Sequence, residues 1–232
     1  MNSIPVIVTI GGLLGIRHAF EPDHLSAVST LATRPAARLW HAARLGLVWG
    51  LGHTLTVGVV ALLIIALGVR LPDRLWPAAE LLVAALLIVL GASVIWRYVS
   101  GRWHMHAHTH PAVATHFHLH SHATDSSHSH LHTRVDARRS LGFGIAHGLA
   151  GSGAIVALLL AAVPDATSRV MYFAAFGAGT IIGMLGVSLT LSLVVRLAVQ
   201  RGTRWAMFLH VGAAAGSIVA GVVLAEQVIL RL

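Results

Sequence analysis

Apolar residues form six long runs along the chain, separated by short segments that contain most of the polar and charged residues. Each run has about 20 residues or more, which is the length of α-helix that crosses the hydrocarbon core of a bilayer. The runs are Ile4–His24, Leu45–Gly68, Ala78–Arg97, Leu141–Val163, Val170–Arg196 and Ala206–Leu230. The pattern predicts an all-α integral membrane protein with six transmembrane helices.

The composition agrees with a protein whose surroundings are a lipid bilayer. Hydrophobic residues make up 56% of the chain and charged residues 10%, and the mean hydropathy is +0.78. A soluble domain would contain about 25% charged residues. The chain has no cysteine. Disulfides and thiolate ligands are therefore excluded, and any metal must be bound by nitrogen and oxygen.

The basic residues are all arginine, and they lie between the apolar runs rather than on one basic face. This distribution argues against a nucleic-acid partner, despite the net charge of +8. Eleven arginines follow the first, third and fifth runs: Arg34, Arg38, Arg44, Arg97, Arg102, Arg134, Arg138, Arg139, Arg196, Arg201 and Arg204. The segments that follow the second, fourth and sixth runs have four arginines: Arg70, Arg74, Arg169 and Arg231. The positive-inside rule then predicts a multi-pass bacterial inner-membrane protein with both termini outside and the third connecting segment cytoplasmic.

The third connecting segment divides the chain into three parts. Residues 1–100 form a first three-helix membrane unit, 101–136 a histidine-rich cytoplasmic segment, and 137–232 a second three-helix unit. Eleven of the 17 histidines lie in the middle part: His104, His106, His108, His110, His116, His118, His120, His122, His128, His130 and His132. Alternating histidine with small or polar residues cannot bury a core, so we expect disorder in the absence of metal.

Histidines two positions apart suggest that this segment binds metal. Neutral imidazoles chelate borderline divalent cations, and their affinity should fall as they protonate below about pH 6.5. The alternatives are a flexible tether and a pH-sensitive cluster of charge. Because the segment lies outside the membrane, it can buffer, sense or deliver metal but cannot itself be a pathway across the bilayer.

The two membrane units resemble each other in sequence. Three pairs of segments match at nearly one offset: Gly15–His18 with Gly144–His147, Trp49–Thr54 with Phe176–Thr180, and Leu87–Gly91 with Ser217–Gly221. Since each unit has three runs, the second would be inserted upside down, giving a 3+3 inverted repeat of the kind found in many secondary transporters. The alternative is chance similarity among glycine-rich apolar helices.

The end of the first run, Arg17–His24, has five ionisable side chains in eight positions. An ionisable side chain costs roughly 2.5–3.5 kcal/mol at the centre of a spanning helix, so such a cluster indicates a functional site. Pro22 cannot donate a hydrogen bond and clashes with a carbonyl one turn earlier, so the helix should end or unwind here. That break would let His18, Asp23 and His24 converge, although His18 and His24 would point about 120° apart on a straight helix. Two imidazoles and a carboxylate suit nickel, cobalt, zinc or ferrous iron.

Two further histidines lie within apolar runs and are candidate ligands. His53 lies in Gly50–Thr54, where small neighbours permit close backbone approach, and His147 matches His18 in the second unit. For both, the alternative is a hydrogen bond between helices. We expect His41 and His210 to be structural or interfacial.

Two patterns concern packing rather than chemistry. Glycine pairs at a spacing of four predict close helix contacts: Gly11/Gly15, Gly144/Gly148, Gly179/Gly183 and Gly212/Gly216. Tryptophans mostly near the ends of runs are typical of interfacial anchors: Trp40, Trp49, Trp76, Trp96, Trp103 and Trp205.

The segment Arg17–His24 resembles the H-x4-D-H signature of the nickel/cobalt transporter superfamily, and Leu51–Thr54 resembles its short L-G-H-[ST] motif. The histidine-rich segment is similar to that of the nickel/cobalt efflux branch. The resemblance implies a transporter, not an enzyme, with nickel or cobalt as substrate and no permanent cofactor; zinc is a further possible substrate. It also implies that His18, Asp23, His24 and His53 select and carry the metal. The family usually has Asp-Ala where this chain has Glu21-Pro22, and its uptake permeases have one more leading helix.

Three other functions remain open at this point. His18-x4-Asp23 has the spacing of H-x4-D acyltransferases, in which the aspartate orients a histidine base. Ser152 and His210 would be the pair of an intramembrane serine protease. A membrane metal sensor would bind metal only through the histidine-rich segment, without transport.

The sequence leaves several properties of a transporter undetermined. These are the direction of transport, the choice among nickel, cobalt and zinc, the energy source, and the role of Glu21-Pro22. The partners that the sequence permits are a divalent metal ion, the lipid bilayer, a second copy of the chain in a homo-oligomer and a cytoplasmic metal-accepting protein.

Overall fold

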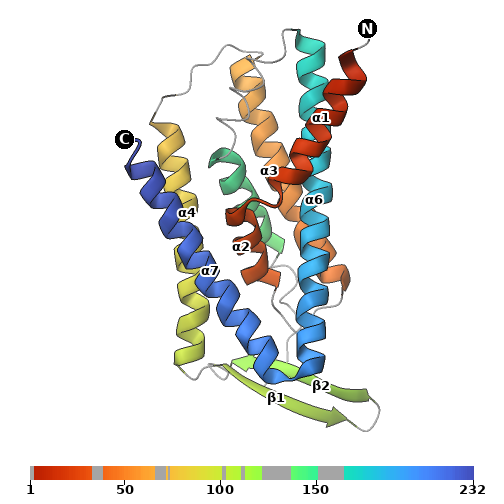
Figure 1. Ribbon diagram of the computed structural model, residues 1–232, viewed down its shortest axis with the longest axis vertical. Coiled ribbons are helices and arrows are strands. Elements are labelled where there is room, and N and C mark those ends of the chain that lie inside the picture. The colour runs from red at the N-terminus through yellow and green to blue at the C-terminus, as the bar shows by residue number, and fades with distance from the viewer. Residues whose placement is uncertain are drawn as a thin grey trace.

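The computed structural model describes residues 3–32, 39–65, 72, 74–100, 103–110, 113–121, 137–150 and 165–232. Its long helices run roughly along one axis, with a two-stranded hairpin at one end (Figure 1). The elements are α1 (Ser3–His18), α2 (Pro22–Ala32), α3 (Leu39–Ile65), α4 (Leu75–Val99), β1 (Trp103–His110), β2 (Val113–Ser121), α6 (Ala166–Arg201) and α7 (Thr203–Ile229). Residues 137–150 are also helical.

Four of these helices, α3, α4, α6 and α7, are long and apolar enough to cross a membrane. The pair α1 and α2 passes the same test as one broken span. The chain is therefore an α-helical protein of the membrane-spanning type. The predicted run Leu141–Val163 is described only as far as residue 150, so the prediction of a sixth span lies partly outside the described residues.

The helices extend beyond the apolar runs that predict them. α3 begins at Leu39 rather than Leu45, which places Arg44 within a helix instead of in a connecting segment, and α6 covers Ala166–Arg201 instead of Val170–Arg196. Hydropathy locates the part of a helix that is suited to hydrocarbon, whereas backbone hydrogen bonding continues into the polar zone beyond it.

The predicted helix break at Pro22 is confirmed. α1 ends at His18, the amides of Phe20 and Glu21 form turns to the carbonyls of Arg17 and His18, and the axes of α1 and α2 are bent by 52°. Pro22 is the first residue of α2, where its missing N–H would have had no helical partner. α2 then continues to Ala32, which the apolar run did not predict.

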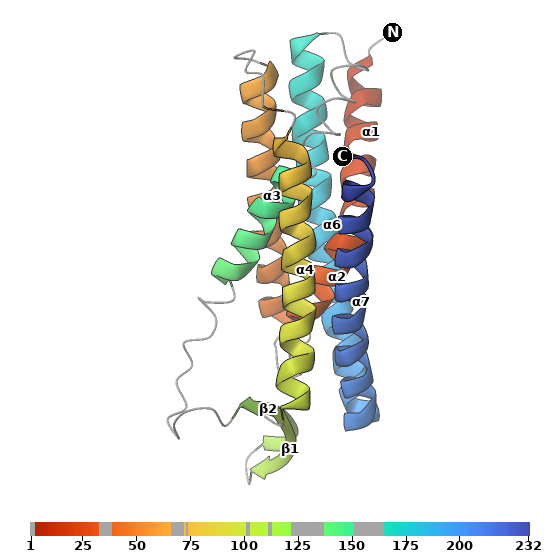
Figure 2. The same ribbon diagram turned by 90° about the vertical axis from the view of Figure 1, so that its left-hand side faces the viewer.

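Glycines allow the helix backbones to approach closely in two places. α1 and α3 both pack on α6, and α4 lies against α7 on one side of the molecule (Figures 1 and 2). A Cβ atom at Gly15 would clash with the carbonyl oxygen of Phe176, and one at Gly91 would clash with that of Ala214. These contacts fix the spacing of α1 with α6 and of α4 with α7.

The prediction of helix packing at Gly212 and Gly216 is wrong. A Cβ atom at either position would meet nothing within 4 Å. Both glycines instead line an apolar cavity of about 310 Å³ between α2, α6 and α7. A spacing of four residues places two glycines on one face of a helix, but it does not determine whether another helix covers that face.

The hairpin pairs the histidines of its two strands. The antiparallel register sets three histidine pairs opposite each other at alternate positions: His104/His120, His106/His118 and His108/His116. Figure 2 places the hairpin beyond the end of α4. His110 also lies in β1, whereas the remaining candidates of this segment lie outside the described residues: His122, His128, His130 and His132. Disorder of the metal-free segment in solution stays a prediction.

Candidate metal centre

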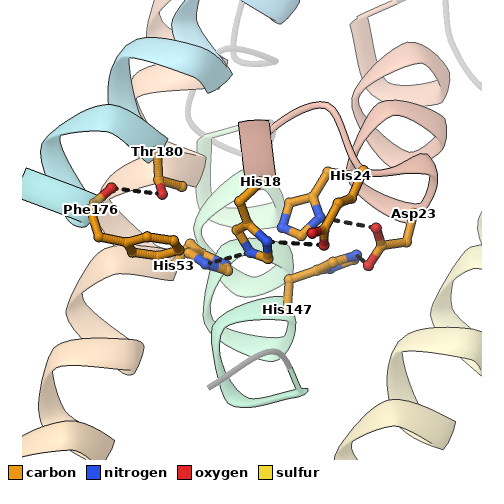
Figure 3. A network of polar contacts seen from close by, with 8 residues as sticks. His18, Asp23, His24, His53, His147, Phe176 and Thr180 are labelled. Carbon is orange, nitrogen blue, oxygen red and sulfur yellow. Dashed lines mark hydrogen bonds and ion pairs between the residues drawn. The ribbon is translucent and has the colours of Figure 1, made fainter. Parts of the chain in front are cut away.

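Side chains from four parts of the chain meet at the break between α1 and α2 (Figure 3). His18 is the last residue of α1, Asp23 and His24 lie in the first turn of α2, His53 lies within α3, and His147 lies in the helical segment 137–150. The four histidines are buried, with exposed fractions between 0% and 7%. A buried group of ionisable side chains within a bundle of apolar helices is expensive to desolvate and indicates a site with a function.

His18 occupies one end of this group. Its Nε2 atom lies 3.2 Å from Nε2 of His53, and its Nδ1 atom lies 2.9 Å from Oε2 of Glu21. The Glu21 side chain is half exposed, so it joins the buried imidazole to the surface of the protein. A carboxylate on one ring nitrogen holds the imidazole in place and leaves the other nitrogen facing the group.

Asp23 links two other histidines. Its Oδ1 atom lies 3.1 Å from Nδ1 of His24, and its Oδ2 atom lies 3.7 Å from Nε2 of His147. His18 takes Glu21 as its carboxylate partner, so Asp23 does not orient His18 as the acyltransferase interpretation requires. Ser152, the nucleophile of the protease interpretation, lies outside the described residues.

His147 is held in place by its own helix and by α3. Its Nδ1 atom lies 3.3 Å from the carbonyl oxygen of Phe143. A Cβ atom at Gly144 would clash with the carbonyl oxygen of Trp49, and one at Gly148 would lie 2.7 Å from that of His53. The two glycines therefore let the backbone of 137–150 lie directly on α3, which brings His147 within reach of Asp23.

The donor atoms lie close to the spacing of ligands around a metal ion. Donors about 2.1 Å from one ion lie about 3 to 4.3 Å apart. The ligand atoms form two groups, His18/His24/His53 and Asp23/His24/His147, and within each group they lie within 4.8 Å of one another. His24 Nε2, His53 Nδ1 and His147 Nε2 are buried and have no hydrogen-bond partner in the described part of the chain. Buried polar atoms are normally satisfied, so these nitrogens fit a site that receives a cation.

The structure thus brings together all five candidates that the sequence placed within the membrane. His41 and His210 belong to neither group of ligand atoms. The hairpin histidines lie at the end of the molecule, away from the α1–α2 break (Figure 1).

Trp49 is a neighbour of the site that sequence analysis misplaced. Instead of anchoring the chain at an interface, its side chain is buried, stacks on Phe143 and lies 5.4 Å from the ring of His147. Its position one turn before His53 on α3 was the available signal, because residues four apart share a helix face. Phe176 was also missed, and its ring lies 5.5 Å from that of His18.

Comparisons of the sequence with known proteins found a family model and a relative. Residues 6–100 match the family model described as High-affinity nickel-transport protein (NicO), a range that contains every candidate ligand of the cluster except His147. The chain is 34% identical over 196 residues to the urease accessory protein UreH of Bacillus sp. (strain TB-90), an alignment that covers 80% of this chain and 78% of that protein. No solved structure matches the chain.

Proposed function

This chain belongs to the nickel/cobalt transporter superfamily, and on that premise we propose that it carries nickel or cobalt ions across a membrane through the buried cluster at the α1–α2 break. The observation that carries the proposal is the convergence of His18, Asp23, His24 and His53 with His147 in a bundle of apolar helices. Imidazole and carboxylate suit these ions, and zinc shares the same ligand preference. Among the ligand atoms found in the described residues, the carboxylate of Asp23 partly offsets the 2+ charge of the ion.

The helices form a 3+3 inverted repeat, and reciprocal contacts support this arrangement. Gly15 of α1 lies against the carbonyl of Phe176 in α6, and its counterpart Gly144 lies against the carbonyl of Trp49 in α3. Phe176 is also the counterpart of Trp49 in the aligned sequence. A twofold relation between the units requires such an exchange of partners.

The last helix of each unit repeats the same relation. Gly91 of α4 lies against the carbonyl of Ala214 in α7, whereas Gly221 of α7 lies against the carbonyl of Ala84 in α4. Both pairs follow the offset that aligns Leu87–Gly91 with its counterpart in the second unit. The packing of α4 on α7 thus supports the same twofold relation between the units as the contacts of Gly15 and Gly144.

Transport proceeds by alternating access. The ion, partly dehydrated, binds to neutral imidazoles and ionised Asp23, and leaves on the other side as one unit rocks against the other. Both termini face outwards and residues 101–136 are cytoplasmic in the bacterial inner membrane. This arrangement needs the termini and the hairpin on opposite sides of the membrane, and in Figure 1 the start of α1 and the end of α7 lie away from the end that carries the hairpin.

The test is the amount of metal in bacteria that express the chain. We would measure total cellular nickel and cobalt in cells with the wild-type chain, His24→Ala or the control His41→Ala at matched membrane levels, over a series of external concentrations. We expect the wild type and His41→Ala to differ from His24→Ala, and the sign of the difference gives the direction of transport. Equal metal content in all three strains would refute the proposal for nickel and cobalt.

A further inference from the structure

Resting on the proposed transport, we infer that the cluster contains two overlapping metal positions that share His24 and are occupied one at a time. The first position, the histidine triad, consists of His18, His24 and His53. The second, the aspartate triad, consists of Asp23, His24 and His147. An ion that crosses the protein passes from one triad to the other by exchanging ligands around His24.

The geometry separates the two triads. Their ligand atoms form two distinct groups, within each of which the atoms lie within 4.8 Å of one another, and only His24 belongs to both. The His24 ring lies 4.6 Å from the ring of His18 on one side and 4.7 Å from that of His147 on the other. His24 therefore lies between the two groups, as Figure 3 also shows.

The triads are built on different helices. The histidine triad joins the end of α1 and the start of α2 to α3, all within the first unit. The aspartate triad joins the start of α2 to residues 137–150 of the second unit. His24 of α2 is therefore the link between a triad within the first unit and a triad that reaches the second unit.

The shared histidine makes the two positions exclusive. A neutral imidazole has one lone pair available for a metal, so His24 can bind an ion in only one triad at a time. Two divalent ions so close together would also repel each other strongly. The cluster should consequently hold one ion per chain.

The two positions also differ in charge. The ligands of the histidine triad are three imidazoles, whereas the aspartate triad includes one carboxylate. Oxygen donors are harder ligands than imidazole nitrogen, so an ion bound in the two triads should have different electronic spectra. This difference provides a direct way to distinguish the positions.

The experiment uses Co²⁺ as probe and the purified full-length chain, with serine in place of the eleven histidines between 104 and 132 so that bound metal reports on the cluster alone. Metal content and visible absorption are measured for this chain and for His53→Gln, His147→Gln and His24→Gln made in it. Glutamine keeps a polar, hydrogen-bonding side chain, and gel filtration establishes that each variant is folded.

We expect one Co²⁺ per chain in the parent, one in His53→Gln and one in His147→Gln, with different absorption spectra in these two variants. His24→Gln should bind at least ten times more weakly than either. Two ions in the parent, or complete loss of binding in folded His53→Gln or His147→Gln, would overturn the two-position model. The metal content of cells tests transport separately, so a transporting chain with one indivisible site would refute this inference and leave the proposed function standing.

Discussion

The Nε2 atoms of His18 and His53 lie 3.2 Å apart, although 35 positions separate the two residues in the chain. The contact crosses from the end of α1 to the middle of α3, and neither residue is more than 7% exposed. A pair of buried imidazoles at this distance can accept a cation with little movement of the backbone. Several side chains around this pair can be changed singly, and each has a matched control elsewhere in the chain.

Asp23 is the only carboxylate within the two groups of ligand atoms in the described part of the chain. Asp23→Asn should abolish metal transport while leaving membrane insertion intact, because the substitution removes one negative charge without changing the size of the side chain. Cellular nickel and cobalt, measured at equal amounts of membrane-inserted protein, provide the readout. Glu80→Gln is the control, since Glu80 pairs with Arg231 and belongs to neither ligand group. Normal transport by Asp23→Asn would refute the proposal that this site carries the metal.

Glu21 contacts Nδ1 of His18, the ring nitrogen that does not face His53. We expect Glu21→Gln to weaken metal binding about 10- to 100-fold, the usual effect of removing a carboxylate that orients a ligating histidine. Transport should decline at low external metal and recover at high concentrations. Metal titration of the purified protein measures the affinity, and Glu226→Gln is the control. An unchanged affinity would mean that the Glu21–His18 contact has no part in binding.

Gly183 and Gly186 lie on the same helix, α6, but differ in their surroundings. A Cβ atom at Gly183 would lie 2.6 Å from Cβ of Ala19, whereas one at Gly186 would meet nothing within 4 Å. Gly183→Ala should therefore destabilise the protein by about 1–3 kcal/mol through overpacking. Thermal unfolding in detergent should show a lower midpoint for Gly183→Ala and an equal or higher one for Gly186→Ala. The reverse order would contradict the packing of α1 on α6.

Trp49 is 1% exposed beside the candidate metal centre, whereas Trp40 is 72% exposed near the start of the same helix. Trp49→Ala should cost about 3–5 kcal/mol of stability, as is usual when a large buried aromatic side chain is removed. Trp40→Ala should change the unfolding free energy much less. Chemical denaturation of the two variants makes the comparison, and similar losses would mean that Trp49 is not in a packed core.

The hairpin of β1 and β2 lies beyond the end of α4 (Figure 2), so deletion of residues 104–132 should leave part of the transport activity intact. His128→Ala alone should have little effect, because ten histidines of the segment remain. Metal flux in cells is the measurement for both changes. Total loss of flux in the deletion would favour a protein that only binds metal through this segment, and a severe defect in His128→Ala would indicate a structured site there.

Local physics explains what the sequence determined by itself. The length of an apolar run predicts a membrane span wherever it lies in the chain, and the ring of Pro22 interrupts a helix through its own missing N–H and a clash one turn away. Both features depend on neighbouring residues only. The helix break, the apolar spans, and the choice of His18, Asp23 and His24 as candidates followed from such local patterns.

The tertiary structure alone decided which side chains meet. His147 reaches Asp23 because Gly144 and Gly148 let two helix backbones touch, and the sequence gives no measure of that approach. The same applies to Trp49. Its place in the sequence is typical of an interfacial residue, but its side chain stacks on Phe143 of residues 137–150. Burial and distance between remote segments depend on how whole helices pack, and the order of residues along one helix does not contain that information.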